Sequence, residues 1–356
     1  MRTTRRHSHQ CSRCSKSDCQ GCRPCEDSGR CDARKSPYFI EVCKEDRNIA
    51  RFRQRGPRDP LAHDDGPSCT TKDCGVQLYV EDLGPRCGPT LVIIGGLANP
   101  LQAEYQETLA LQGFRVVSID LRGFGRSDKP LEPYSLDVWA DDLREVLDEL
   151  AIEDAVLIAP SASSRIGVRY AARHCCAHIA KLVLLAPFLG TTPPASVGLP
   201  AALIDTLEAQ ALVDRESLVI NLDPNFNAFY FPQAVPPAYA FANNVFAAQG
   251  STPWSVAALF ASFRENITAD LPRVCVPTLV LNGGADIINP VPLAQAVAAG
   301  IPDAELVIAP GWGHFYLAFG AGAQLFNAQV SAFARGEPQP PVPAPPAPVL
   351  PAASEP

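Results

Sequence analysis

A serine stands at the end of an apolar run, where its hydroxyl can become a nucleophile. Ala155–Pro160 is almost wholly apolar, Ser161 follows in a turn of small residues, and a helical pattern covers residues 165–174. A sharp turn between a strand and a helix lifts the serine oxygen clear of the sheet, and the backbone N–H of the next residue, Ala162, then faces the reacting carbonyl. The stretch therefore predicts a serine that transfers acyl groups.

Such a serine requires a base within hydrogen-bond reach and a third group that orients the base. His314 lies in a loop, Pro310–Phe315, directly after a predicted strand, and Asp286 follows the preceding strand by a few residues. Loops of this kind gather where α/β sheets place their sites, although Asp286 could also simply cap its Gly-rich turn. The order Ser161, Asp286, His314 is the one expected for this arrangement. The remaining histidines lie near the N-terminus or at the far end of the helix after Ser161: His7, His9, His63, His174 and His178.

The oxygen of the reacting carbonyl must be held by hydrogen-bond donors, and two backbone N–H groups are expected to do this. Ala162 supplies the first because it follows the nucleophile. Leu97 is expected to supply the second, because it lies in the turn after Gly95-Gly96 at the end of another apolar run.

A parallel sheet would bring these loops to one edge. Apolar runs alternate with helical patterns, which predicts right-handed crossovers, while residues 75–84 read as an antiparallel strand. The predicted fold class is α/β, with a mostly parallel central sheet and helices on both faces. The expected strands are 90–94, 115–119, 154–160, 181–186, 278–282 and 305–309, and the expected helices are 100–112, 135–150, 165–174, 291–299 and 324–335.

Between about residues 187 and 272 this alternation breaks, and the chain becomes rich in proline and aromatic residues. This segment predicts a helical insertion that acts as a lid with an apolar underside; ordinary helical packing is the alternative. An apolar pocket under a lid suits a small apolar acyl substrate. The rings expected to line it are Phe229, Phe231, Phe241 and Trp254.

The two ends differ from the body, which is expected to span residues 73–335. Residues 1–70 are basic and rich in cysteine, and pairs such as Cys11 and Cys14 have zinc-ligand spacing, but no regular second half completes a metal site. A poorly ordered leader is therefore the favoured interpretation, and no metal or other cofactor is predicted. Residues 337–356 hold nine prolines and predict an extended, disordered tail.

Charge and hydropathy narrow the class of protein. Residues 1–70 carry 15 basic and 10 acidic side chains, so the remainder carries 15 against 28, a net charge of −13. Such an acidic body argues against nucleic acid as a partner. No apolar run reaches the roughly 18 residues that span a bilayer, and no secretory signal is recognisable. A cytoplasmic location is expected, with the oligomeric state left open; disulfides among the leader's thiols would argue against that location.

Three motifs resemble the α/β-hydrolase family across residues 73–335. They are Asp120–Pro130, Val276–Val280 with Gly284–Asp286, and Gly311–Phe315. The resemblance implies that Ser161, Asp286 and His314 are nucleophile, acid and base. The stretch from Trp254 to Leu271, leading into Val276-Pro277, is similar to the cofactor-free haloperoxidase and aryl esterase branch, which implies an esterase that can also form peracids.

The sequence departs from the family pattern at the two turns that matter most. The family has Gly-x-Ser-x-Gly around its nucleophile, whereas Ala159 and Ser163 stand in the two glycine positions and Pro160 precedes the serine. The His-Gly before the oxyanion turn is replaced by Gly95-Gly96. We therefore keep three hypotheses: ester, thioester or lactone hydrolysis through an acyl-serine; perhydrolysis or carbon–carbon bond hydrolysis by the same triad; and a weakly active or non-catalytic binding protein of the same fold.

Overall fold

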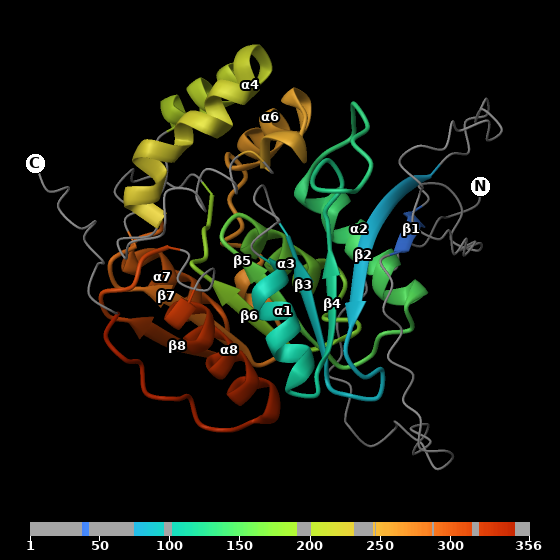
Figure 1. The fold of residues 1–356 in the computed structure, drawn as a ribbon, viewed down its shortest axis with the longest axis vertical. Helices are drawn as coiled ribbons and strands as arrows, with labels where there is room; N and C mark the ends of the chain where they lie inside the picture. Colours follow the sequence, from blue (N-terminus) through green and yellow to red (C-terminus); the bar gives the residue numbers. More distant parts are fainter. Residues whose placement is uncertain are drawn as a thin grey trace, which may run out of the picture.

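A twisted sheet of eight strands runs through the computed structural model (Figure 1). The structure describes residues 38–42, 75–95, 102–190, 201–230, 245, 247–286, 288–314 and 320–345. In sheet order the strands are β1-β2-β4-β3-β5-β6-β7-β8; the first two are antiparallel to their neighbours and the others pair in parallel. Their bounds are β1 Tyr38–Val42, β2 Val76–Leu83, β3 Thr90–Ile94, β4 Arg115–Ile119, β5 Ala155–Pro160, β6 Ile179–Leu185, β7 Thr278–Gly283 and β8 Ala304–Ala309.

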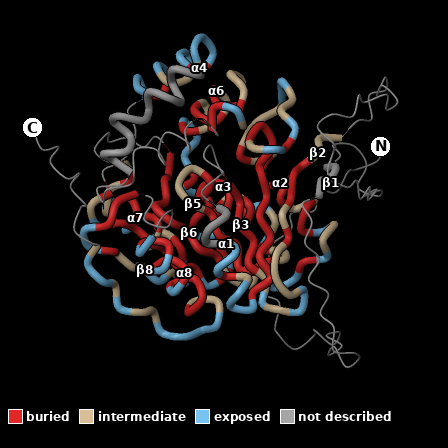
Figure 2. The backbone as a smooth tube through the Cα atoms, viewed as in Figure 1, coloured by how far each residue is buried: buried red, intermediate tan, exposed pale blue. Residues whose placement is uncertain are grey.

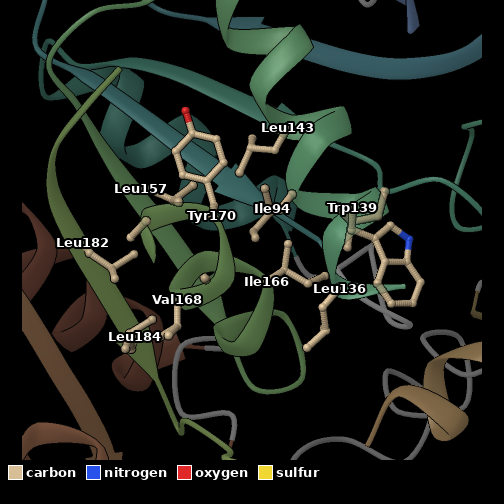
Figure 3. Close-up of a cluster of buried hydrophobic side chains, with 14 of the residues drawn as sticks. Ile94, Leu136, Trp139, Leu143, Leu157, Ile166, Val168, Tyr170, Leu182 and Leu184 are labelled. Carbon is tan, nitrogen blue, oxygen red and sulfur yellow. The ribbon is translucent and has the colours of Figure 1, made fainter. Parts of the chain in front are cut away.

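Helices cover both faces of the sheet, as the alternating pattern predicted. Helices α1 (Gln102–Leu111) and α8 (Gly320–Arg335) lie over one face, and α2 (Leu136–Glu149), α3 (Ser163–Arg173) and α7 (Val291–Gly300) over the other. Successive side chains of a strand point to opposite faces. In β3, Leu91 and Ile93 therefore join the core under α8, whereas Val92 and Ile94 join the core under α2 and α3. The sheet is therefore buried on both faces, and Figure 2 shows that the buried residues lie at the centre of the molecule. Figure 3 shows the core between the sheet and helices α2 and α3.

The start of α2 illustrates how the sequence determines an element boundary. Ser135 has an extended backbone, and its hydroxyl accepts a hydrogen bond from the N–H of Val138 at 3.1 Å. A side chain that accepts from the first turn satisfies an N–H group that has no partner within the helix. Trp139 and Leu143 then follow on the buried face of the helix.

One segment of the expected leader is part of the sheet. The sequence analysis took residues 1–70 as poorly ordered, yet Tyr38–Val42 forms β1 and pairs antiparallel with β2 from Tyr38↔Val80 to Val42↔Val76. Its sequence, YFIEV, is rich in residues that favour strands. The expectation overlooked it because five apolar-rich residues are too short to stand out within a Cys- and Arg-rich stretch.

The insertion between β6 and β7 is helical in its described parts. It contains α4 (Ala201–Tyr230, interrupted at Asp214), α6 (Pro253–Ser262) and a short 3₁₀ turn at Leu271–Arg273. The two long helices lie side by side (Figure 1). Arg165 of α3 anchors the end of α6, because its fully buried guanidinium donates to the carbonyl oxygens of Ser262 and Glu265. Burial lowers the pKa of Arg165 to about 10. Because this value is still well above neutral pH, the side chain stays charged.

Part of the Pro-rich tail packs against the body. Residues 337–345 have no regular secondary structure, as nine prolines predicted, but this part of the tail is not detached. Val342 lies against the core under α8, and the carbonyl oxygen of Pro343 accepts a 2.9 Å hydrogen bond from the indole N–H of Trp312. The described part of the tail therefore contacts the loop that carries His314.

A disulfide joins Cys176, just beyond α3, to Cys275, just before β7. Disulfides persist mainly in oxidising compartments, so this bond weighs against the expected cytoplasmic location. None of the helices in the described ranges is both long and apolar enough to cross a bilayer.

Candidate active site

Ser161 lies at the sharp turn between β5 and α3, with a backbone conformation that non-glycine residues rarely adopt. Its φ is +48°, and its N–H donates to the carbonyl oxygen of Leu185 at 2.7 Å. The next residue, Ala162, already has helical angles, and α3 begins at Ser163. A positive φ of this kind strains the backbone and persists only where the surrounding structure imposes it. The turn holds the Ser161 hydroxyl beyond the end of β5, as the sequence predicted.

The three residues expected to act together form one chain of hydrogen bonds. Ser161 Oγ lies 2.8 Å from His314 Nε2, and His314 Nδ1 lies 2.7 Å from Asp286 Oδ2. His314 is fully buried and Asp286 is 4% exposed, whereas Ser161 is half-buried. An aspartate on one imidazole nitrogen leaves the other free to accept a proton from the serine. The geometry is therefore that of a nucleophile, a base and an orienting acid.

The carboxylate of Asp286 is itself fixed by the backbone that follows it. Its Oδ1 accepts hydrogen bonds from the N–H groups of Ile288 and Asn289, both at 2.9 Å, while Oδ2 faces His314. The turn-capping role weighed for this aspartate and the role beside His314 are thus both present, one on each oxygen. These two backbone donors fix the orientation of the carboxylate.

The acid loop and the histidine loop are joined by backbone hydrogen bonds. Gly284 donates to Ala309 at 2.7 Å, and Ala285 donates to Trp312 at 2.8 Å. A Cβ on Gly283 would lie 2.3 Å from the carbonyl oxygens of Trp312 and Gly313. The glycine is therefore required by the close passage of the second loop. The sequence analysis saw only a Gly-rich turn here, because nothing in the sequence shows which backbone passes over it.

The alanine in place of the first glycine of the family pattern is accommodated by a glycine elsewhere. A Cβ on Gly167 of α3 would lie 2.9 Å from the Cβ of Ala159 and 3.4 Å from Leu182 Cδ1. The helix can therefore approach β5 closely despite the methyl group of Ala159. The sequence analysis named Ala159 as a departure from the family pattern and did not identify Gly167, although a glycine inside a helical pattern is a recognisable signal of close packing.

The serine in place of the second glycine makes a specific contact. Ser163 is 2% exposed, and its hydroxyl donates to the carbonyl oxygen of Gly95 at 2.8 Å. Gly95 lies at the start of the expected oxyanion turn, and its own N–H donates to Ile119 at 3.1 Å. Ala162 stands directly after the nucleophile, at the start of α3, where the first N–H groups of a helix have no intrahelical acceptor. Leu97 lies outside the described residues.

The most specific sequence motif, Asp120–Pro130, is held in place by hydrogen bonds and ion pairs of its side chains. Asp120 is 1% exposed and accepts hydrogen bonds from the backbone and side chain of Arg126. Burial raises the pKa of Asp120, and the Arg126 guanidinium opposes that rise. Arg122 forms a buried two-point ion pair with Asp142 of α2. These contacts give the motif a structural role in fixing the loop after β4.

Most of the residues expected to line the pocket have side chains outside the part of the chain that the structure describes. Phe231 and Phe241 lie outside the described residues, as do the leader cysteines, and Phe229 belongs to the last turn of α4. Trp254 is half-buried on α6, and its indole N–H donates to the carbonyl oxygen of Lys129 at 3.3 Å. This bond brings α6 against the loop after β4. Within the described ranges no cluster of three or more histidine, cysteine or acidic side chains is arranged to hold a metal.

With a parallel sheet, a nucleophile turn and a hydrogen-bonded Ser-His-Asp chain established, comparison with known proteins identifies the class. Residues 89–321 match the alpha/beta hydrolase fold family, and the protein belongs to that family. It is 34% identical to the AB hydrolase superfamily protein YisY of Bacillus subtilis, over 67% of this chain and 89% of the relative.

Further relatives define the branch of the family. The protein is 28% identical to the bifunctional esterase/perhydrolase DCH of Acinetobacter calcoaceticus, over 69% of this chain and 91% of that one. Non-heme chloroperoxidases and a haloperoxidase from other bacteria are also similar to it. The crystal structure of a bromoperoxidase from Bacillus anthracis superposes with a TM-score of 0.66 at 26% identity, covering 73% of this chain and 96% of that one. The protein is an α/β-hydrolase of the haloperoxidase branch, as its sequence motifs indicated.

Proposed function

We propose that this protein is a serine hydrolase that cleaves carboxylic esters, thioesters or lactones through an acyl-serine intermediate. The single observation that carries the proposal is the continuous hydrogen-bond chain from Ser161 Oγ through His314 to Asp286. Its relatives include a protein named as an esterase/perhydrolase, which supports the same chemistry. No cofactor is required, because the three side chains supply the nucleophile and the proton transfers.

Each residue has a defined role in the proposed reaction. Ser161 Oγ attacks the substrate carbonyl carbon while His314 Nε2 accepts the hydroxyl proton. The tetrahedral oxyanion is held by the N–H groups of Ala162 and Leu97. His314 then returns the proton to the leaving alcohol, and water attacks the acyl-serine by the reverse sequence. Asp286 holds the imidazole in the tautomer that presents Nε2 to the serine and stabilises the imidazolium that forms.

Substrate access is assigned to the helical insertion. We propose that α4 and α6 form the lid and that an apolar acyl group lies beneath it, with Phe229, Phe231, Phe241 and Trp254 as lining residues. Support comes from the anchoring of α6 on both sides: Arg165 holds its end, and Trp254 contacts the loop after β4. The first of these contacts connects the insertion to α3, the helix that follows Ser161.

Perhydrolysis is a second candidate, because the named activity of the Acinetobacter relative includes it. In that reaction hydrogen peroxide replaces water as the attacking group on the acyl-serine. One of its two equivalent oxygens bonds to the acyl carbon while His314 accepts the proton. The bond from the acyl carbon to Ser161 Oγ then breaks, His314 returns the proton to that oxygen, and a peracid leaves. The same three residues serve both reactions, so the two candidates differ only in the nucleophile that the pocket admits.

The proposal is tested by hydrolysis of p-nitrophenyl acetate by the wild type and by Ser161→Ala at equal folded concentration. We expect turnover by the wild type and a fall of at least about 1000-fold in the variant, because removal of a triad member leaves only binding and oxyanion stabilisation. Ser331→Ala, on α8, is the matched control and should retain activity. A wild type that neither hydrolyses short esters nor reacts with a fluorophosphonate would contradict the hydrolase proposal and favour a non-catalytic member of the fold.

A further inference from the structure

Two departures from the family pattern contact each other beside the nucleophile. Ser163 occupies a position that is glycine in the family, and Gly95 occupies the position of the family's histidine before the oxyanion turn. In the structure the Ser163 hydroxyl donates to the Gly95 carbonyl oxygen at 2.8 Å. We propose that Ser163 is a positioning residue that fixes the entry to the oxyanion turn, and that its hydroxyl compensates for the additional glycine in that turn.

The Ser163 hydroxyl is not occupied in capping its own helix. Serine at the start of a helix commonly accepts a hydrogen bond from a backbone N–H of the first turn. Here α3 has no side-chain cap at its start, and the Ser163 hydroxyl instead acts as a donor to the carbonyl of Gly95, the residue that follows β3. Ser163 is 2% exposed, and a buried hydroxyl destabilises the fold unless it forms a hydrogen bond. The contact thus satisfies the hydroxyl and immobilises Gly95.

Gly95 is held at both of its backbone groups. Its N–H donates to the carbonyl oxygen of Ile119 on β4 at 3.1 Å, and its own carbonyl accepts from Ser163. Because a peptide unit is planar, fixing this carbonyl fixes the plane of the peptide that follows Gly95. Glycine imposes little restriction on its own dihedral angles, so Gly95 would have more conformational freedom without these two hydrogen bonds.

The inference rests on the proposed function, because it assigns Ser163 a role in that reaction. Donors act on a developing oxyanion only when they are already in place, which is why a displaced donor lowers the rate of the chemical step. Loss of the Ser163 hydroxyl should therefore lower kcat more than it raises KM. Complete removal of one donor typically costs about 100- to 1000-fold, so loosening of the turn should cost on the order of 10-fold.

The test compares an oxygen ester with the matching thionoester, in which sulfur replaces the carbonyl oxygen. Sulfur accepts hydrogen bonds poorly, so an ordered oxyanion turn favours the oxygen ester more strongly. In Ser163→Ala we expect the ratio of kcat/KM for the two esters to fall about 10-fold, and in Ser163→Thr, which keeps the hydroxyl, we expect the ratio to recover. Both esters are measured on one preparation, so the ratio does not depend on the fraction of folded protein.

Ser164→Ala is the matched control, because Ser164 is an adjacent buried serine whose hydroxyl accepts from the N–H of Phe188 and does not contact Gly95. Its ratio should equal that of the wild type. If Ser163→Ala lowers both rates equally, or leaves both unchanged, the positioning role is wrong while the hydrolase proposal stands. If the wild type hydrolyses neither ester, the hydrolase proposal fails and this inference fails with it.

Discussion

At the scale of single residues, the backbone conformation of Ser161 depends on how its small neighbours pack. The positive φ of Ser161 requires α3 to turn back closely against β5. Gly167 and Ala159 share the space between helix and strand, because a Cβ at position 167 would lie 2.9 Å from the Cβ of Ala159. The sharp turn between β5 and α3 therefore depends on a complementary pair of residues, Ala159 and Gly167.

This pairing predicts strong coupling between two substitutions. Gly167→Ala should lower the free energy of unfolding by about 1–3 kcal/mol, because the new Cβ would lie 2.9 Å from that of Ala159. Ala159→Gly in the same chain should recover the loss, since it restores the space and alanine favours the helix. Urea unfolding of the wild type, both single variants and the double variant measures the coupling energy. Additive effects would show that the two residues do not share one space.

At the scale of elements, the loop that carries His314 is held from two sides. The acid loop joins it through the bond from Ala285 to the Trp312 carbonyl, and the tail joins it through the bond from the Trp312 indole to Pro343. Trp312 is 3% exposed and belongs to the core under α8. Pro345 lies over Gly311, with its Cδ 3.1 Å from a Cβ position on that glycine. The first residues of the tail thus act as a strap over the histidine loop.

Removal of the strap should destabilise the loop. A chain that ends at Gly336 would lose the bond to Trp312 and the packing of Val342, for about 1–3 kcal/mol of stability. We also expect weaker ester hydrolysis, because His314 is two residues from Trp312. A chain that ends at Pro345 keeps these contacts and is the control. Thermal unfolding and kcat of both truncations decide the matter; equal behaviour of the two chains would show that the strap contributes nothing.

At the scale of the whole molecule, the insertion is connected to the sheet through α3, the helix that follows Ser161. Arg169 of α3 pairs with Asp137 of α2 and with Glu265 and Asp270 of the insertion. Nearby, the Cys176–Cys275 disulfide links the end of α3 to the entry of β7 across a sequence separation of 99 residues. The helices after the nucleophile, the insertion and the second half of the sheet are thus joined through α3.

The disulfide should contribute measurably to stability. Closing a loop of roughly 100 residues restricts the unfolded chain, and removal of such a bond costs about 2–5 kcal/mol. Cys176→Ser/Cys275→Ser should therefore unfold at a lower temperature than the wild type under oxidising conditions. Cys175→Ser, the exposed neighbouring thiol, is the control. Peptide mapping without reductant should recover residues 176 and 275 as one linked species; two unlinked peptides would contradict the bond.

The sequence by itself predicted most of the elements and the residues proposed for the site. Apolar runs of strand length, the Ser135 cap and the chain order of Ser161, Asp286 and His314 are local features, and each reports a preference that acts within a few residues. Strand β1 was missed because a five-residue strand is determined by pairing with β2 and not by its own pattern.

Only the tertiary structure decided how residues distant in sequence compensate each other. The contacts between Ala159 and Gly167, Ser163 and Gly95, Gly283 and the Trp312 backbone, and Trp312 and Pro343 each depend on which backbones pass close together. A departure from a motif looks like added strain when it is read alone. Its effect depends on the volume and the hydrogen-bond groups opposite it, which come from segments that the folded sheet brings into contact.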